Sequence, residues 1–193
     1  MTPEQMKSLI LYEDDDIIVL NKPASLLVHP VAKDSVALTQ FLPPGVELAH
    51  RLDRETSGCL VLGKNPAALR RLGQWFKTGQ IRKTYHALVS GKLEGSGVID
   101  APLIKENALM VVREDGQRSV TEWRALEQRD GSTLVELHPL TGRTHQLRAH
   151  MRHLGHPIVG DVKYDGPPAE RMMLHASALN LPGLQRIEAK LPF

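Results

Sequence analysis

The stretch HRLDRETSG, at residues 50–58, carries more information about this chain than any other. Seven of its nine residues are polar or charged, and an apolar run follows it directly at 59–62. Polar side chains are costly to order beside a buried strand unless they have partners or a task. Polar loops are also common on protein surfaces, so a surface loop with a Thr-Ser turn explains the composition equally well.

The segment RKTYHA, at 82–87, follows a predicted helix and places Tyr85 among basic residues on a predicted strand. A tyrosine in such a setting can stack on a nucleobase. A core tyrosine whose hydroxyl finds a partner at the edge has the same pattern. The pattern alone favours this second interpretation.

The third segment is LTGRTHQLRAH at 140–150, in which a Thr-Gly turn precedes a predicted helix. Thr144 has a side chain that suits a helix N-cap. Arg148 and Arg152 project from the helix four residues apart, and an arginine can pair bidentately with a carboxylate or a phosphate. The alternative interpretation is that these arginines are only solvated.

The composition limits the classes of protein to which the chain can belong. Its 193 residues suit one compact domain, or one domain with two lobes, and 41% hydrophobic and 24% charged residues are ordinary for a globular protein. A single cysteine, Cys59, excludes a disulfide scaffold. No apolar run approaches the roughly 20 residues that span a bilayer, and the N-terminus lacks the features of a signal peptide. We therefore expect a cytoplasmic protein.

Charge is distributed unevenly along the chain, whose formal net charge is +2. Residues 64–92 contain seven basic residues and no acid, and residues 143–156 contain three arginines, four histidines and no acid. Two such stretches indicate one positive face, which would attract a polyanion such as nucleic acid. Basic residues that merely solvate amphipathic helices give the same pattern.

The hydrophobic pattern predicts many short strands and few helices. Helices are expected at 66–76 and at 144–154, the second closed by Gly155. Strands are expected at 17–20, 26–29, 59–62, 82–90, 133–138 and 172–181, with a hairpin formed by 109–112 and 119–126. Strands and helices do not alternate regularly, so the pattern predicts an α+β fold with a mixed, mostly antiparallel central sheet flanked by helices and loops. We expect a single domain over 1–193, with residues 1–12 as a lead-in. Any division of this domain into two lobes would be shallow, with a cleft between them.

Four histidines, His145, His150, His153 and His156, raise the alternative of a metal-dependent enzyme. Their spacing matches no standard metal site, and neither an HExxH motif nor a nearby cysteine is present in the sequence. The sequence also has no GxGxxG or GxxxxGK phosphate loop and no GxSxG nucleophile motif. It therefore predicts no metal site and no nucleotide cofactor.

The three segments together resemble the RluA-type RNA pseudouridine synthases. HRLDRETSG is similar to their signature loop, RKTYHALVSG at 82–91 to their tyrosine motif, and LTGRTHQLRAH to their arginine motif. The stretches EDDDIIVLNKPASLLVHP at 13–30, GHPIVGD at 155–161 and LHASAL at 174–179 fit the same family. The resemblance implies the pseudouridine synthase fold, with a basic active-site cleft in a single catalytic domain.

By this resemblance the chain is expected to be an isomerase that converts specific uridines of structured RNA to pseudouridine without cofactor or metal. The bond from ribose to N1 of uracil breaks, the base rotates, and it reattaches through C5. The expected substrates are tRNA, large-subunit rRNA or both. Many relatives carry an additional N-terminal RNA-binding domain, but only a short segment precedes the core here, so we expect a stand-alone catalytic domain. We further expect a monomer with RNA as its partner and no membrane association.

The resemblance also assigns roles to residues. It makes Asp53 the catalytic carboxylate, which either attacks the anomeric carbon or takes a proton from the neighbouring ribose carbon to give a glycal. It makes Arg148 the partner of this aspartate, and Tyr85 the residue that stacks on the base and helps to remove the C5 proton. Arg51 is expected to take the place of the base that is flipped out of the stack. Further RNA-binding residues are expected to be His50, Thr56, Lys83 and Arg143, of which His50 and Thr56 also shape the loop.

Two other functions are compatible with parts of the pattern. The chain could bind RNA without catalysis, although the presence of Asp53, Tyr85 and Arg148 together argues against this. It could also be the metal-dependent enzyme considered above. Isomerisation of RNA, RNA binding without turnover, and bound metal distinguish the three hypotheses.

Overall fold

The computed structural model describes residues 3–30, 32 and 35–193. Two compact units make up the chain: Met1–Arg82 with Ala176–Pro192, and Lys83–His175 with Phe193. The polypeptide passes from one unit to the other inside two strands, β5 (Arg82–Ser90) and β11 (Leu174–Asn180). The expected single catalytic domain over 1–193 stays a prediction. None of the helices in the described part of the chain is long and apolar enough to cross a membrane.

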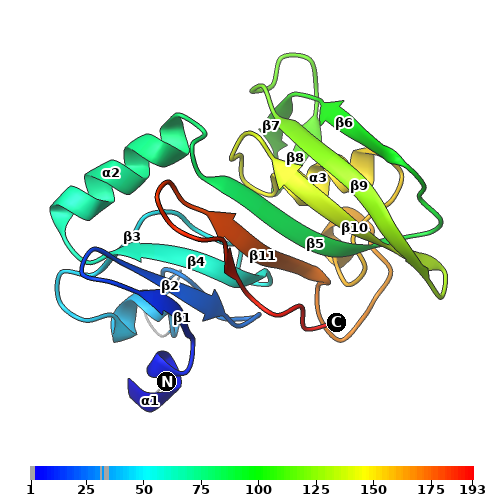
Figure 1. Cartoon of the computed structure of the whole chain (residues 1–193). Coiled ribbons are helices and arrows are strands. Elements are labelled where there is room, and N and C mark those ends of the chain that lie inside the picture. The colour runs from blue at the N-terminus through cyan, green and yellow to red at the C-terminus, as the bar shows by residue number, and fades with distance from the viewer. Residues whose placement is uncertain (1–2, 31, 33–34) are drawn as a thin grey trace. The chain divides into compact units, whose positions relative to one another are not determined.

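The first unit is built on a sheet that carries one long helix. Besides β11, its elements are α1 (Pro3–Lys7), β1 (Ile10–Glu13), β2 (Ile17–Lys22), η1 (Leu38–Phe41), β3 (Glu47–Leu48), β4 (Ser57–Gly63), α2 (Pro66–Lys77) and β12 (Ile187–Glu188). The strand order is β1-β2-β4-β11, with β3 paired to β4 and β12 paired to β11. Helix α2 packs against β4 (Figure 1), and its buried Ala68 and Leu72 join Val19 and Val61 in the core of this unit.

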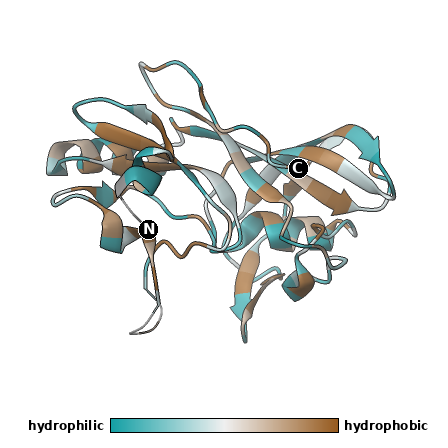
Figure 2. Cartoon of the chain, turned by 90° about the horizontal axis from the view of Figure 1, so that it is seen from below, coloured by the Kyte–Doolittle hydropathy of each residue, from teal (hydrophilic) through white to brown (hydrophobic). Residues whose placement is uncertain are grey.

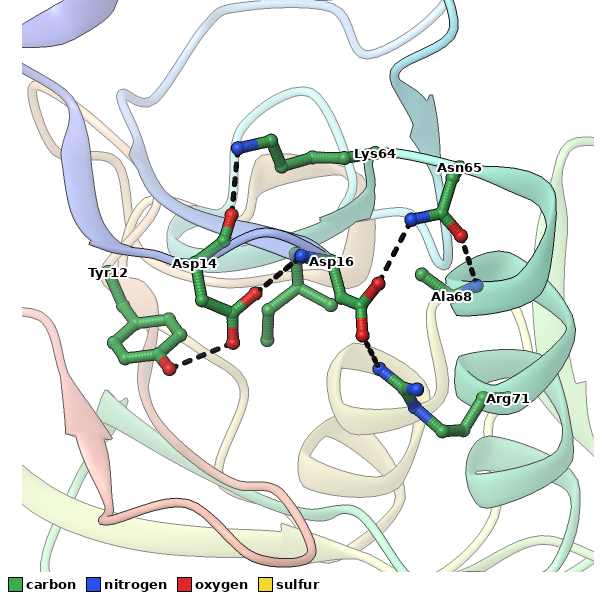
Figure 3. Close-up of polar contacts among 8 residues, drawn as sticks. Tyr12, Asp14, Asp16, Lys64, Asn65, Ala68 and Arg71 are labelled. Carbon is green, nitrogen blue, oxygen red and sulfur yellow. Dashed lines mark hydrogen bonds and ion pairs between the residues drawn. The ribbon is translucent and has the colours of Figure 1, made fainter.

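The start of α2 is fixed by a polar network around the β1–β2 turn (Figure 3). Asn65 is the N-cap of the helix, and its side chain accepts a hydrogen bond from the amide of Ala68 at 2.8 Å. Asp16, in the turn, accepts hydrogen bonds from Asn65 at 3.0 Å and from Arg71 at 2.7 Å. The turn is thereby tied to the first two turns of the helix.

Asp14 holds the other side of the same turn. Its carboxylate accepts hydrogen bonds from the amides of Ile17 at 2.7 Å and Asp16 at 2.8 Å and from the hydroxyl of Tyr12 at 2.9 Å. Burial acts to raise the pKa of Asp14, but these hydrogen bonds outweigh it and hold the pKa below its usual range. The ammonium of Lys64 donates to the Asp14 carbonyl oxygen at 2.7 Å, which connects the turn to the end of β4.

The second unit consists of a four-stranded antiparallel sheet, a separate hairpin and one helix. Besides β5 it contains β6 (Ser96–Asp100), β7 (Leu103–Glu106), β8 (Leu109–Val112), β9 (Val120–Arg129), β10 (Ser132–Pro139), α3 (Gln146–His153) and η2 (Val162–Tyr164). The sheet has the order β5-β10-β9-β6, and β7 pairs with β8. Ala87, Val89 and Leu137 from the sheet pack with Leu147 and Met151 of α3 in the core. Figure 2 shows both hydrophobic (brown) and hydrophilic (teal) segments in the strands.

The predicted α+β fold class is confirmed, because few helices accompany sheets in which the strands pair mostly antiparallel. The helix predicted at 66–76 is α2, and the strands predicted at 17–20, 59–62, 82–90 and 133–138 are β2, β4, β5 and β10. The strand predicted at 172–181 is the shorter β11. Strand β2 continues through Asn21 and Lys22, which the pattern assigned to a turn.

One predicted strand pairing and one predicted strand are wrong. Strand β8 pairs with β7 and not with β9, because the chain after the turn at Gly116 returns along β7, where the amide of Gln117 donates to the Leu103 carbonyl at 2.8 Å. The strand predicted at 26–29 is reduced to one bridge between Leu27 and Ala37. Its neighbouring carbonyl at Leu26 accepts a hydrogen bond from the side chain of Lys22 instead of joining a ladder.

The predicted N-cap of the second helix is also wrong. Helix α3 begins at Gln146, and its N-cap is His145, not Thr144. His145 has φ of 49° and ψ of 22°, a left-handed conformation that is unfavourable for residues other than glycine. Its side chain makes no capping hydrogen bond, so contacts elsewhere must hold it in place.

Candidate active site

Asp53 lies in the loop that leads into β4, between two buried residues. Its own position is half-buried, whereas Leu52 is 7% exposed and Thr56 is 3% exposed. The amide of Thr56 donates to the carbonyl oxygen of Asp53 at 3.2 Å, which closes a turn over residues 53–56. The loop therefore presents the aspartate from a short segment that is anchored on both sides.

Lys22 also anchors the loop that carries Asp53, although sequence reasoning did not single it out. Its side chain is fully buried, and Nζ donates hydrogen bonds to the carbonyl oxygens of Pro23 at 2.9 Å, Leu26 at 3.0 Å and Arg54 at 3.0 Å. An ammonium group has three donors and no acceptor, so three carbonyls match its capacity. The end of β2 is thereby tied to the residue that follows Asp53.

Gly58, the last residue of the 50–58 stretch, packs against a neighbouring strand. Its φ is +108°, and a Cβ at this position would overlap the backbone of Ala176 in β11. Only glycine fits this conformation and this approach. The position thus requires glycine for backbone reasons, and it sets how β4 begins after the Asp53 turn.

The remaining predicted residues of this loop differ in exposure. The ring of His50 is held within the first unit, because its Nε2 accepts a hydrogen bond from the amide of Val61 at 3.1 Å and the ring lies 4.8 Å from that of Phe76. Thr56 is buried, whereas Arg51 is exposed. His50 and Thr56 therefore contribute to the shape of the loop, and RNA contacts by all three residues stay predictions.

The second unit carries the other predicted site residues. On β5, Tyr85 is half-buried against the hydrophobic core, and Lys83 lies two residues earlier on the same face of the strand. Nζ of Lys83 is 3.5 Å from the carbonyl oxygen of Thr141, beside Gly142. Burial lowers the pKa of Lys83. The structure thus brings Lys83 to the loop of the arginine motif, whose Arg143 is exposed and donates to the Arg118 carbonyl at 3.3 Å.

Arg148 projects from α3 and is 4% exposed. Its guanidinium forms a bidentate ion pair with Asp161, with Nε to Oδ2 and Nη2 to Oδ1 both at 2.7 Å. The guanidinium carbon also lies 4.9 Å from the ring centroid of Tyr164. Within the second unit, the partner of Arg148 is Asp161, which sequence reasoning did not name. The prediction that Arg148 serves Asp53 of the first unit stays open.

Gln146 holds the loop from which α3 starts, and its side chain is 4% exposed. Its Oε1 accepts hydrogen bonds from the hydroxyl of Thr141 at 2.8 Å and from the amide of Arg143 at 3.0 Å. Its Nε2 donates to the carbonyl of Val120 at 2.9 Å and to the hydroxyl of Thr121 at 3.0 Å. The four bonds satisfy the amide completely. They connect the arginine motif to β9, and nothing in the residue pattern distinguished this glutamine from a solvated one.

Three of the four histidines of this region, His145, His150 and His156, make hydrogen bonds within the second unit. Nδ1 of His145 lies 2.9 Å from the Tyr164 hydroxyl, Nδ1 and Nε2 of His150 contact the Thr121 hydroxyl at 2.9 Å and the Ala101 carbonyl at 3.0 Å, and Nδ1 of His156 lies 2.8 Å from the Ser90 carbonyl. Among the described residues, no group of three or more histidine, cysteine, aspartate or glutamate side chains is placed to hold a metal ion.

Part of the basic stretch at 64–92 is neutralised by acids outside it or at its end. Lys64 pairs with Glu13 at 2.9 Å, Arg71 with Asp16 at 2.7 Å and Lys92 with Glu94 at 2.7 Å. These are three of the seven basic residues in the stretch. The acidic run at 13–16 therefore reduces the positive charge that the count alone predicts.

Comparison with known proteins decides the family. The family model described as RNA pseudouridylate synthase matches residues 16–153, which include Asp53, Tyr85 and Arg148. The chain belongs to the RNA pseudouridylate synthase family. Membership confirms the resemblance inferred from the motifs and the predicted enzyme class, an RNA pseudouridine synthase.

Relatives in this family match almost the whole chain. An uncharacterized RNA pseudouridine synthase of Zymomonas mobilis is 41% identical and covers 95% of this chain and 93% of its own length. The tRNA pseudouridine synthase C of Salmonella typhimurium is 42% identical, with 89% of this chain and 79% of that protein covered. The ribosomal large subunit pseudouridine synthase C of Vibrio vulnificus is 38% identical over 90% of this chain, which spans 61% of the length of that enzyme.

A solved structure confirms the fold of the family. The human RNA pseudouridylate synthase domain containing 4 protein superposes with a TM-score of 0.85 at 29% identity, covering 98% of this chain and 90% of that one. The pseudouridine synthase fold that the motifs implied is therefore confirmed.

Proposed function

We propose that this member of the pseudouridine synthase family isomerises defined uridines in structured RNA, and that its substrates are tRNA, large-subunit rRNA or both. The named relatives support the two RNA classes, because one is a tRNA enzyme and another a large-subunit enzyme. We also propose that it acts as a cytoplasmic monomer, without a nucleotide cofactor. The observation that carries the proposal is Asp53, a carboxylate within the matched family region, on a loop anchored by Lys22 and Gly58.

In the proposed reaction, Asp53 starts the cleavage of the bond between C1′ of ribose and N1 of uracil. Its carboxylate either attacks C1′ or removes a proton from C2′ to give a glycal. The detached base leaves with the bonding electron pair on N1 and turns. C5 then bonds to C1′ as the bond from C1′ to the Asp53 carboxylate breaks, or, in the glycal route, as the proton returns to C2′. N1 takes up a proton, and the proton on C5 passes to solvent. Tyr85 stacks on the base and assists this proton transfer, and Arg148 orients Asp53 through charge-assisted hydrogen bonds.

A uridine inside folded RNA reaches a protein carboxylate only after it leaves the stack, at a cost of a few kcal/mol. The exposed, planar guanidinium of Arg51 suits the vacated position. Phosphate contacts are proposed for Lys83 and Arg143 and for exposed basic residues of the 64–92 stretch. Arg70, Lys77 and Arg82 are exposed and form no ion pair with any residue that the structure describes.

The test is incubation of the purified protein with unmodified tRNA and with unmodified large-subunit rRNA, followed by nuclease digestion and mass spectrometry of the nucleosides. Pseudouridine is isobaric with uridine but elutes separately, so its appearance reports the reaction directly. We expect pseudouridine in at least one RNA pool, at few positions. RNA binding without pseudouridine in either pool would contradict the proposal and favour an RNA-binding protein.

A further inference from the structure

Asp161 is a deeply buried aspartate that has no role in the reaction as proposed above. It is 2% exposed and is the bidentate partner of Arg148, whose side chain is equally enclosed. Removing two charges from water is expensive, and well-packed apolar residues often replace a buried ion pair without loss of stability. A buried pair of this kind is therefore weak evidence for a purely stabilising role.

The surroundings of the pair restrict the guanidinium further. The ring of Tyr164 lies under Arg148, with the guanidinium carbon 4.9 Å from the ring centroid. The hydroxyl of Tyr164 accepts a hydrogen bond from the amide of Met110 at 2.9 Å and lies 2.9 Å from Nδ1 of His145, which packs edge-on against the ring. The left-handed N-cap His145 is thus used to hold the ring on which Arg148 rests.

The backbone around Asp161 is as constrained as its side chain. The amide of Asp161 donates to the Ile158 carbonyl at 3.0 Å, and its carbonyl accepts from the amides of Tyr164 and Gly166, both at 2.9 Å. Gly160 has φ of +81°, and a Cβ there would overlap the carbonyl of Arg171. The segment is also bonded to the strand that carries Tyr85, because the amide of Val159 donates to the Leu88 carbonyl at 2.9 Å. These backbone contacts therefore hold the Asp161 carboxylate in one position.

We propose that Asp161 is a positioning residue for the isomerisation: it holds the guanidinium of Arg148 in the orientation that the reaction needs. The inference rests on the proposed function. The bidentate pair uses Nε and one N–H of Nη2, so the N–H groups of Nη1 point in a direction that Asp161 fixes. Asp161 also balances the charge of Arg148, which then acts as an oriented hydrogen-bond donor more than as a net positive charge.

The same helix offers a matched control. One turn beyond Arg148, Arg152 pairs with Asp165 through Nε at 2.6 Å, and the two pairs have the same sequence separation of 13 residues. The Arg152 and Asp165 side chains are 40% and 67% exposed, however, whereas those of Arg148 and Asp161 are 5% and 1% exposed. Exposed ion pairs contribute little to stability. Asp165→Asn therefore makes the same chemical change at an ion pair for which no role in the reaction is proposed.

The experiment measures the single-turnover rate of tritium release from C5-labelled RNA, the dissociation constant for RNA, and the unfolding midpoint of each variant. We expect Asp161→Asn to lower the rate at saturating RNA by about 100-fold, as misplacement of a reacting group by about 1 Å can do. We expect the dissociation constant to change less than about threefold, because the Asp161 side chain is only 1% exposed and so offers little surface to bound RNA. Asp165→Asn should match the wild type in both quantities.

Combining Asp161→Asn with Arg148→Ala distinguishes a positioning role of Asp161 from a purely structural one. If Asp161 acts through Arg148, Asp161→Asn lowers the rate no further once Arg148 is alanine, whereas independent roles would multiply. Asp161→Glu keeps the charge but displaces the carboxylate, and we expect it to fold and to recover part of the rate. If Asp161→Asn does not fold, Asp161→Glu serves as the test variant.

The failure of this inference can be distinguished from failure of the proposed function. An active wild type together with folded Asp161→Asn or Asp161→Glu proteins of wild-type rate would overturn the role of Asp161 alone. A multiplied loss in the combined variant would overturn it as well. A wild type that binds RNA but releases no tritium from any pool would overturn the proposed function, and this inference with it.

Discussion

Replacing Gln146 with leucine tests how the arginine motif is held in place. The buried amide of Gln146 makes four hydrogen bonds, to Thr141, Arg143, Val120 and Thr121, at the point where α3 begins. Leucine has a similar size and is apolar, so the change removes the bonds without leaving a large cavity. Each net hydrogen bond contributes about 1 kcal/mol to stability, which gives an upper value of about 4 kcal/mol for the set.

Three of the four partners keep another hydrogen bond after the change. The Val120 carbonyl still accepts from the amide of Leu140, the Thr141 hydroxyl still accepts from the amide of Val120, and Thr121 still contacts His150. The amide of Arg143 loses its Gln146 acceptor, but Arg143 is exposed, so water can reach this end of the loop. We therefore expect the free energy of unfolding to fall by about 2–4 kcal/mol.

The measurement is urea unfolding followed by circular dichroism, with Gln74→Leu on the exposed surface of α2 as the control. With an m-value of about 2–3 kcal/mol per molar urea, the midpoint should fall by about 1 M. The control should unfold close to the wild-type midpoint, because Gln74 is exposed. A Gln146→Leu midpoint within about 0.2 M of the wild type would refute the view that these four bonds hold the motif.

Three further predictions follow from buried groups. Lys22→Met should lower the free energy of unfolding by about 3 kcal/mol or more, because three carbonyls lose a charged donor, and thermal unfolding against the wild type measures this loss; an unchanged melting temperature contradicts it. Burial lowers the pKa of His150 below its ordinary value of 6.5, so its contribution to stability is present above that pH and is lost as the pH falls. The urea midpoint should therefore decrease between pH 7.5 and pH 5.5, and His150→Gln should flatten this dependence; equal slopes for both proteins would rule the histidine out. Gly58→Ala should prevent stable folding, whereas Gly79→Ala, also at positive φ but with open space around it, should cost about 1 kcal/mol; similar melting curves for the two variants would contradict the proposed crowding at Gly58.

The sequence was sufficient to predict those elements whose evidence is local. Helix α2 has proline at its first position and apolar residues at helical spacing. In β5, buried and half-buried residues alternate from Ala87 to Ser90. Both elements are therefore predicted from the sequence. The family motifs also pointed to Asp53, Tyr85 and Arg148 within the region that the family model matches. These signals depend on a few neighbouring residues, which a single sequence displays.

The features that sequence reasoning missed depend on partners distant in the chain. Lys22 binds a carbonyl 32 residues away, and Gln146 binds Val120, 26 residues before it. His145 replaces Thr144 as the N-cap because Tyr164, 19 residues further on, holds its ring. In the sequence, Asp161 is only the last residue of GHPIVGD, and its pairing with Arg148 is evident only from the structure. No periodicity or local motif reports such contacts.

The central claim is that this chain breaks and remakes the glycosidic bond of uridine by means of Asp53. The most direct measurement is tritium release to water from RNA labelled at C5 of uridine, comparing the wild type with Asp53→Asn, with RNA binding measured on the same preparations. The account predicts release by the wild type and none by Asp53→Asn, while both proteins fold and bind RNA. Equal release by both proteins would contradict the role of Asp53, and RNA binding with no release by the wild type from any RNA pool would contradict the claim itself.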